Sequence, residues 1–230
     1  MIRLSLTTED PEGDCNERLS DDFVERTYGT RRRCEQIQTA NEDGEPDVES
    51  LEFASVEVQD DSATAAFTAR GGEAGEVEGA LEMVREEDDW RIDGMSVPLL
   101  RSLVELGVES TENLPAGGVE CATRKLRAIP DAEFRDFAYQ LLGQRPEGRR
   151  RTLELFAACE GEGGSLLRQA FEEGLVESLR EQNWSQEQID CVIDGTRERV
   201  SDDRLLELLS GENPDAATAQ AIGPAVNACR

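Results

Sequence analysis

The residues of this 230-residue chain that are best suited to chemistry are its six cysteines, because thiols can form disulfides, bind zinc or exchange electrons. None of them shows the C-x-x-C spacing of zinc sites and redox-active thiols, so structural disulfides are favoured. Six cysteines allow 15 connectivities, but a spacing of 38 residues occurs twice, at an offset of 70 positions. The local disulfides that we predict are Cys15–Cys34, Cys121–Cys159 and Cys191–Cys229.

Carboxylates are the remaining candidates for acid–base chemistry, because the chain contains no histidine. A Ser-His-Asp or Cys-His arrangement is thereby excluded. Glu57, Glu78 and Glu82 lie on expected strands and could act as acids or bases if they faced a buried pocket. A solvated face of the sheet is the favoured interpretation of these residues, and we predict no catalytic residue.

The many acidic residues also raise the question of a metal site. The segment 41–49, which reads Asn-Glu-Asp-Gly-Glu-Pro-Asp-Val-Glu, is superficially similar to a calcium-binding loop. Its glycine occupies the fourth position instead of the sixth, and a proline interrupts the series of ligands. We therefore predict neither a metal nor a cofactor.

The N-terminal part of the chain is predicted to be a small α+β domain. Ser20 is a suitable cap for a helix that runs to about Tyr28, with acidic residues in its first turn. Alternation of apolar and polar residues then predicts four strands of an antiparallel sheet. The expected strands span residues 51–58, 62–70, 76–85 and 89–93. One helix packed on such a sheet forms an α+β domain, which we assign to residues 1–97.

The order of residue groups within this domain resembles that of a known family. Cys15, Ser-Asp-Asp-Phe-Val, Thr-Tyr-Gly and Cys34 precede a strand pair that reads Ser-Val-Glu-Val-Gln-Asp-Asp-Ser-Ala-Thr-Ala-Ala-Phe. A Gly-Gly turn and Leu-Glu-Met-Val-Arg-Glu-Glu-Asp-Asp-Trp-Arg-Ile-Asp-Gly-Met follow. This series is similar to the NTF2-like (SnoaL-like) domains of secreted actinobacterial lipoproteins. The resemblance implies a cone-shaped pocket that Tyr28, Phe67 and Trp90 could line, although packing in the core is the favoured interpretation of these three residues.

Residues 98–230 are predicted to form an all-helical domain with an internal duplication. Apolar residues at every fourth position predict a helix over about 165–180, and Ser185 with Gln188 forms a capping box. The two equal cysteine spacings indicate two similar units, each closed by a disulfide from its second helix to its last. The predicted units span residues 98–162 and 163–230.

Charge and cysteine content indicate where the protein acts. The formal net charge of -27 argues against nucleic acid and anionic lipid as partners. No apolar run approaches the ~20 residues that cross a bilayer, so we predict no membrane insertion by this segment. Disulfides persist outside the reducing cytosol, so an extracellular or cell-envelope location is favoured over a cytosolic protein with six free thiols. The first residues lack the apolar core of a signal peptide, and we expect a signal or lipoprotein anchor in the exported precursor.

Three functions are compatible with these features. The favoured one is a non-catalytic secreted or cell-envelope protein that serves as an interaction module for a protein or small ligand. The first alternative is a small-molecule carrier that uses an NTF2-like pocket, which requires a cavity of a few hundred Å³. The second alternative is a carboxylate-dependent enzyme with a buried acid in that pocket.

Overall fold

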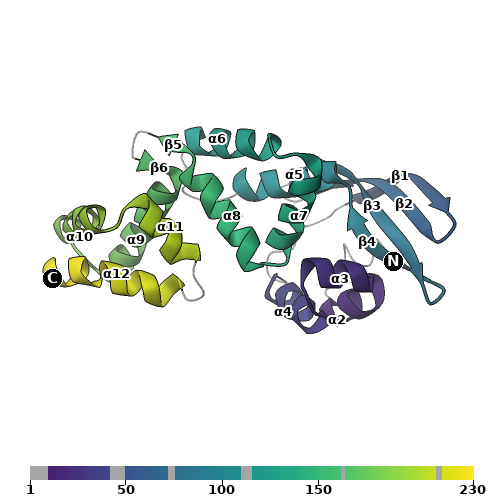
Figure 1. The fold of residues 1–230 in the computed structure, drawn as a ribbon, viewed down its shortest axis with the longest axis horizontal. Helices are drawn as coiled ribbons and strands as arrows, with labels where there is room; N and C mark the ends of the chain where they lie inside the picture. The colour runs from purple at the N-terminus through teal and green to yellow at the C-terminus, as the bar shows by residue number, and fades with distance from the viewer. Residues whose placement is uncertain (1–9, 42–49, 72–75, 110–115, 162–163, 211–213) are drawn as a thin grey trace. The chain divides into compact units, whose positions relative to one another are not determined.

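The computed structural model describes residues 10–41, 50–71, 76–109, 116–161, 164–210 and 214–230, and Figure 1 labels their elements. The chain divides into two compact units. Unit 1 is drawn from Met1–Gly107 and Ile129–Gly148, and unit 2 from Val108–Ala128 and Arg149–Arg230. Unit 1 therefore extends beyond residue 97, where the predicted α+β domain ends, and includes residues of the predicted helical domain.

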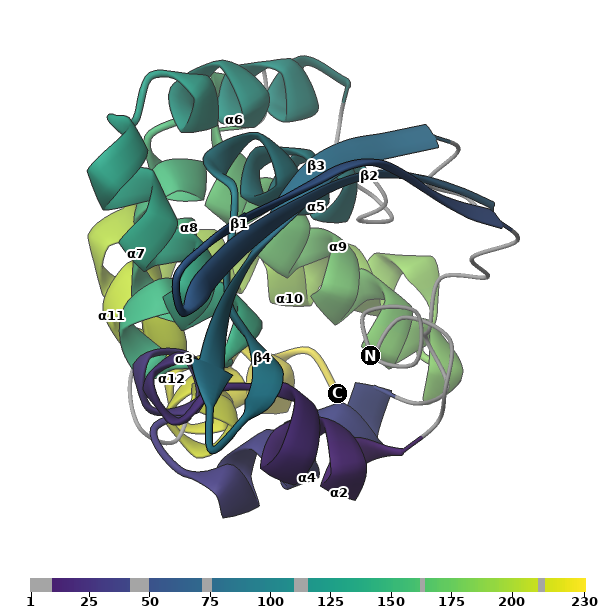
Figure 2. The ribbon, with the colours of Figure 1, turned by 90° about the vertical axis from the view of Figure 1, so that its right-hand side faces the viewer.

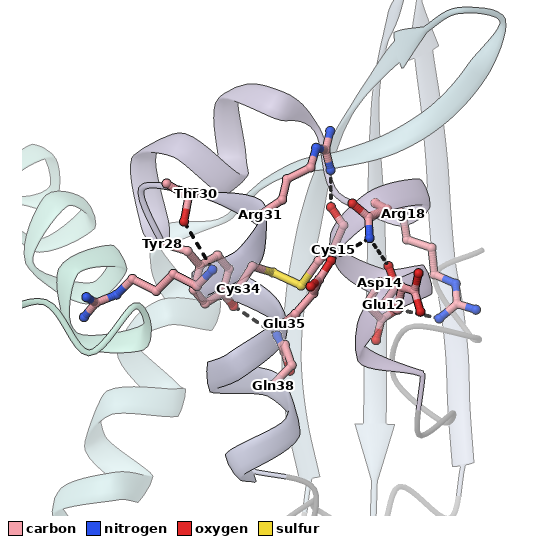
Figure 3. The surroundings of a disulfide bond; sticks show 12 residues. Glu12, Asp14, Cys15, Arg18, Tyr28, Thr30, Arg31, Cys34, Glu35 and Gln38 are labelled. Atoms are coloured by element: carbon pink, nitrogen blue, oxygen red, sulfur yellow. Dashed lines mark hydrogen bonds and ion pairs between the residues drawn. A yellow bond between two sulfur atoms is a disulfide. The ribbon is translucent and has the colours of Figure 1, made fainter.

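Unit 1 begins with short helical segments. These are α2 (Pro11–Gly13), the π-helical turn η1 (Asp14–Arg18), α3 (Asp21–Thr27) and α4 (Arg31–Asn41). Ser20 caps α3 as predicted, because its Oγ accepts a hydrogen bond of 2.9 Å from the N–H of Phe23. Helix α4 was not predicted, since its largely polar sequence shows little apolar periodicity. The disulfide between Cys15 and Cys34 joins η1 to α4 (Figure 3).

The predicted four-stranded antiparallel sheet is present in unit 1. Its strands, in the order β1-β2-β3-β4, are β1 (Ser50–Gln59), β2 (Ser62–Arg70), β3 (Glu76–Glu86) and β4 (Asp89–Met95). Helix α5 (Val97–Glu109) follows β4 and packs against β3 (Figure 2). Glycine at position 79 permits this packing, because a Cβ there would lie 2.5 Å from the Cβ of Leu99.

Helix α7 (Asp131–Leu142) completes the interior of unit 1, although it lies far along the chain from the sheet. The ring of Tyr139 packs edge to face against Phe23 of α3, with 5.5 Å between the ring centroids. The Tyr139 hydroxyl accepts a hydrogen bond of 2.9 Å from the N–H of Met95 at the end of β4. A single side chain thus connects α7 with both α3 and the sheet.

The turn after α7 is also fitted to the end of α3. A Cβ at Gly143 would overlap the carbonyl oxygen of Thr27, so glycine is required by a close approach as well as by the predicted helix stop. Arg145 donates hydrogen bonds to the carbonyl oxygens of Thr27 at 3.0 Å and Glu25 at 2.7 Å. Arg145 thus binds two carbonyl groups at the C-terminal end of α3, of which that of Glu25 also accepts a hydrogen bond from the N–H of Gly29.

The remaining elements are mostly helices. They are α6 (Ala116–Arg127), α8 (Pro146–Ala157), β5 (Glu160–Gly161), β6 (Gly164–Ser165), α9 (Leu166–Glu181), α10 (Gln186–Arg199), α11 (Asp202–Ser210) and α12 (Pro214–Ala228). The two-residue strands β5 and β6 were not predicted, because they are too short to show alternation. The predicted capping box of α10 is present, with Ser185 and Gln188 each accepting a backbone hydrogen bond from the other.

Two disulfides and two apolar clusters hold the helices of unit 2 together. Cys121 is joined to Cys159 and Cys191 to Cys229, and the Cα atoms of each pair lie 5.9 Å apart. These are the partners that the cysteine spacing predicts. The buried members of the clusters are Leu167, Val200, Leu205 and Leu208 in one, and Leu179, Ile189, Val192 and Ile193 in the other. Within the described parts of the chain, no helix combines the length and apolar character that a bilayer crossing requires.

Candidate functional site

The aromatic residues predicted for a pocket have three different environments. Tyr28 is buried, and its hydroxyl accepts a hydrogen bond of 3.0 Å from Nε2 of Gln38 (Figure 3). Burial raises the pKa of the Tyr28 phenol. Phe67 is buried within β2, whereas Trp90 on β4 is partly exposed. Tyr28 and Phe67 therefore lie in the core and Trp90 lies at its border, and none of them lines the two cavities described below.

The three strand carboxylates share one face of the sheet. Thr64 of β2 pairs with Glu57 on one side and with Glu82 on the other, and Thr68, four residues further along β2, pairs with Glu78. Glu57 and Glu78 are exposed. Glu82 forms an ion pair of 3.0 Å with Arg135 of α7, in which the two side chains are 39% and 40% exposed. This face is in contact with water, in agreement with the favoured interpretation.

The carboxylates and cysteines do not gather into a metal site among the described residues. In the part of the chain that the structure describes, no three His, Cys, Asp or Glu side chains are grouped so that they could hold a metal ion. Residues 42–49, which contain nearly all of the segment similar to a calcium loop, lie outside the described residues.

A cavity of about 550 Å³ lies near the disulfide of unit 1. It is lined by Asn16, Asp21, Arg31, Glu86, Glu87 and Arg91. Arg31 donates hydrogen bonds to the carbonyl of Cys15 and the carboxylate of Asp21, and Figure 3 shows it reaching toward Cys15. Nε of Arg91 lies 3.5 Å from the Glu86 carboxylate. Both arginines already face carboxylates of the protein, so little unbalanced charge remains to attract a ligand.

The larger cavity, of about 860 Å³, lies between α9 and α10 and is called the α9–α10 groove. Its α9 residues are Gln169, Glu172, Glu173, Val176, Glu177 and Arg180, and its α10 residues are Asp190, Ile193, Asp194 and Arg197. Both sets follow the three- and four-residue spacing of a single helix face. With a rise of 1.5 Å per residue, the α9 wall from Gln169 to Arg180 is about 17 Å long.

The groove has apolar residues on both walls and a surplus of negative charge. Val176 and Ile193 contribute the apolar side chains, and the former is half-buried and the latter buried. Five carboxylates and two guanidinium groups line the same space. Glu173, Glu177 and Asp190 are exposed, so the unbalanced charge is accessible to a ligand.

Glu172 is the buried charge of this groove, and two arginines hold it. Arg197 of α10 donates hydrogen bonds of 2.9 Å and 2.6 Å to its two carboxylate oxygens. This bidentate pairing connects the two walls and raises the pKa of Arg197. Arg168 lies on the other side of Glu172, with 3.7 Å between Nη1 and Oε1. Glu172 and Arg168 are each 8% exposed, so their charges need these partners.

Arg168 extends the network to the start of α11. It donates hydrogen bonds to the carbonyl of Val200 and to the carboxylate of Asp202. Burial by itself raises the pKa of Asp202, but hydrogen bonds from Ser165 and Arg168 outweigh this effect and lower it. The network thus fixes α9, α10 and α11 relative to one another within unit 2.

The amino-acid sequence did not reveal this site. Both helices and the cap of α10 were predicted, but Glu172 and Arg197 are 25 positions apart on different helices. The signal in the sequence was weak, because α9 carries four glutamates in a strongly acidic chain. In chemical terms, the arrangement can attract a cation along its rim and contact an apolar group through Val176 and Ile193.

Comparisons of the chain with protein-family models, curated proteins and solved structures found no match. The resemblance to NTF2-like domains remains a prediction from the residues that carry it. The candidate function therefore depends on the geometry of the α9–α10 groove and on the disulfides.

Proposed function

We propose that this chain is an exported, non-catalytic binding protein whose α9–α10 groove accepts a basic helical segment of a partner protein. The observation that carries the proposal is the groove itself, an 860 Å³ space with an excess of carboxylates and two apolar contacts. A positively charged segment would complement the five acidic residues of its walls.

A helix fits the groove better than a compact ligand does. The walls are two helix faces, and the longer wall of about 17 Å corresponds to about three helical turns. An amphipathic helix can place one apolar residue between Val176 and Ile193 and basic residues beside the exposed carboxylates. The pairing of buried Glu172 with exposed Arg197 would hold the walls in place before binding, which lowers the entropic cost of association.

The cysteines support a location outside the cytosol. All six are joined in disulfides between described residues. Such bonds persist in oxidising compartments, which supports a location in the extracellular space or the cell envelope. The net charge of -27 favours basic partners there and disfavours nucleic acid.

The order of the helices supports the proposed duplication. Helices α5 to α8 and α9 to α12 are two sets of four, and in each set a disulfide runs from the second helix to the residues after the fourth. The two copies would nevertheless have diverged in packing, because α7 belongs to unit 1 and its counterpart α11 to unit 2. The NTF2-like assignment of residues 1–97 is retained as a proposal on its sequence motifs alone.

The two alternative functions have less support. A small-molecule carrier would need a cavity around Tyr28, Phe67 and Trp90, and these residues do not line either cavity described. A carboxylate-dependent enzyme would need an acid enclosed in a pocket, whereas Glu57 and Glu78 are exposed and Glu82 is bound to Arg135.

Binding of a fluorescent synthetic helix of leucine and lysine tests the proposal. We expect saturable binding to the wild-type protein that weakens about tenfold when Glu173→Gln and Glu177→Gln are combined, because two attractive charges are lost. Val176→Asp should also weaken binding, since it removes an apolar contact without reducing negative charge.

The matched control combines Glu187→Gln with Glu198→Gln on α10. Both residues are exposed, neither lines the groove, and the change in net charge is the same. Equal weakening by the control and by the groove variant would indicate nonspecific attraction to the acidic surface and would contradict the proposal. Absence of saturable binding to the wild type would do the same.

A further inference from the structure

The two edges of the sheet in unit 1 differ in how they are protected. The edge formed by β4 is covered, because Leu19 forms a parallel bridge with Ile92 and the N–H of Ser20 donates a hydrogen bond of 2.9 Å to the Ile92 carbonyl. Arg26 also donates to the carbonyl of Asp93. Among the described residues, no strand or bridge pairs with the outer side of β1. Unpaired N–H and C=O groups at such an edge are a template for another strand.

Strand β1 also exposes apolar side chains that an edge strand ordinarily lacks. Phe53, Val56 and Val58 are 44%, 59% and 62% exposed. Their partners across the ladder, Phe67, Ala65 and Ala63 of β2, are all buried. Since paired residues share a face, the apolar face of the sheet continues to β1 but is left uncovered there.

The opposite face of β1 is acidic. Glu52 and Glu57 lie on this face, opposite Thr68 and Thr64 of β2. The next strand adds Glu78 and Glu82 to the same two rows. Arg70 forms an ion pair of 3.2 Å with Glu52, but the face retains an excess of negative charge. A strand added beside β1 would therefore meet apolar residues on one face and carboxylates on the other.

We propose that β1 is a docking edge, at which an extended segment of a partner protein with alternating apolar and basic residues joins the sheet as a fifth strand. Main-chain hydrogen bonds would supply affinity, and the alternation of side chains would supply specificity. Apolar residues of the segment would pack beside Phe53, Val56 and Val58, while its basic residues would face Glu52 and Glu57. This surface is independent of the α9–α10 groove, since it uses other residues in the other unit.

Charge distinguishes this partner from a second copy of the chain. Pairing of two β1 strands with their apolar residues on one face would bring Glu52 and Glu57 of both copies together on the other face. Like charges in neighbouring strands are destabilising, and each copy carries a net charge of -27. A bulge at Ala54 further disfavours regular pairing of two identical edges.

Hydrogen exchange with a defined probe tests the docking edge. The probe is a short synthetic peptide with blocked ends in which valine and lysine alternate, and its control alternates valine and glutamate. We expect the lysine peptide to slow exchange of amides in Ser50–Gln59, and the glutamate peptide to have no effect. Protection elsewhere without protection of β1 would overturn the proposal.

Two variants locate the interaction at β1. Glu57→Arg should weaken binding of the lysine peptide about fivefold to tenfold and improve binding of the glutamate peptide, because an attractive pair becomes repulsive. Glu120→Arg is the matched control, since it changes an exposed residue of α6 and the net charge by the same amount. Val56→Lys combined with Val58→Lys should abolish binding of the lysine peptide, with circular dichroism checking that the sheet remains folded.

Other results of these experiments would overturn the docking edge or identify a different occupant of β1. Equal effects of Glu57→Arg and Glu120→Arg would contradict the proposal, as would slow exchange, before any peptide is added, of the β1 amides that are not bonded to β2. Slow exchange in the free monomer would mean that a segment of this chain occupies the edge. Concentration-dependent protection, with a dimer in sedimentation, would identify a second copy as the occupant.

Discussion

Unit 1 and unit 2 are stabilised by different kinds of interior. In unit 1, aromatic side chains from distant segments pack against one another, as Phe23 and Tyr139 do, and Phe134 and Phe137 add an edge-to-face pair at 6.1 Å. In unit 2, the apolar clusters are mainly aliphatic, and buried Arg168 and Glu172 adjoin them. An aromatic interior needs few polar partners, whereas buried charges must be paired, so the second arrangement is the more sensitive to loss of one side chain.

The Cys191–Cys229 disulfide of unit 2 is more exposed than the disulfide of unit 1, whereas Cys159 of unit 2 is buried. Cys15 and Cys34 of unit 1 are both 0% exposed. Cys191 of unit 2 is exposed, and its partner Cys229 is partly exposed. The chain has two tryptophans, Trp90 in unit 1 and Trp184 in unit 2, so a single-tryptophan variant can report the unfolding of each unit separately.

Loss of Arg168 is expected to have the largest effect. Arg168→Ala should destabilise unit 2 by about 3–5 kcal/mol, because it removes a buried partner of Glu172 and leaves the Val200 carbonyl without its donor. Urea unfolding followed by Trp184 fluorescence in a Trp90→Phe background measures this change. Arg150→Ala, which breaks an exposed ion pair of 2.9 Å with Glu154, should cost less than about 1 kcal/mol. Both residues lie in unit 2, so equal losses in the two variants would contradict the expected sensitivity of this unit to loss of a buried charge.

Gly143→Ala should act on unit 1 by steric overlap. The added methyl group would meet the Thr27 carbonyl, so we expect a loss of about 1–3 kcal/mol, measured by Trp90 fluorescence in a Trp184→Phe background. Gly174→Ala is the control, because no atom lies within 4 Å of its added Cβ and alanine favours the α9 helix. It should leave unit 1 unchanged and stabilise unit 2 slightly. If Gly143→Ala destabilised unit 2 instead, α7 would not unfold together with unit 1.

The smallest effects concern pH, and they have opposite directions in the two units. Burial raises the pKa values of Tyr28 and Tyr139, so their contribution to unit 1 is complete below pH ~10 and is lost as pH rises through the raised values. The lowered pKa of Asp202 contributes to unit 2 above pH ~4 and is lost as pH falls through the lowered value. Melting curves recorded at a series of pH values with each single-tryptophan variant should show a loss of stability at alkaline pH in unit 1 and at acid pH in unit 2.

Two substitutions test these assignments. Tyr139→Phe should reduce the loss of stability of unit 1 at alkaline pH. Asp202→Asn should reduce part of the loss of stability of unit 2 at acid pH. An equal loss of stability in both units as pH rises would contradict the assignment to tyrosines, because the chain has two tyrosines and both lie in unit 1.

Local sequence determined much of the secondary structure. Alternation of apolar residues was sufficient to predict the four strands, and the serines at positions 20 and 185 marked helix starts, because these signals act within a few residues. The cysteine spacing was sufficient to predict the three disulfide partners. Helix α4 escaped prediction although Thr30 caps it by accepting a hydrogen bond from the N–H of Arg33, because its largely polar sequence has no clear apolar stripe.

Tertiary structure alone decided which elements share a core and which surfaces are open. The fit of Gly143 and Arg145 against the end of α3 spans more than a hundred positions, so no local pattern could assign α7 to unit 1. The same holds for the two candidate sites. An exposed Val58 and a buried Ala63 look alike in an alternating strand, and the pairing of Glu172 with Arg197 depends on the approach of two helices. Sequence specifies which residues are apolar or charged, but the packing of distant segments determines which of them remain available for binding.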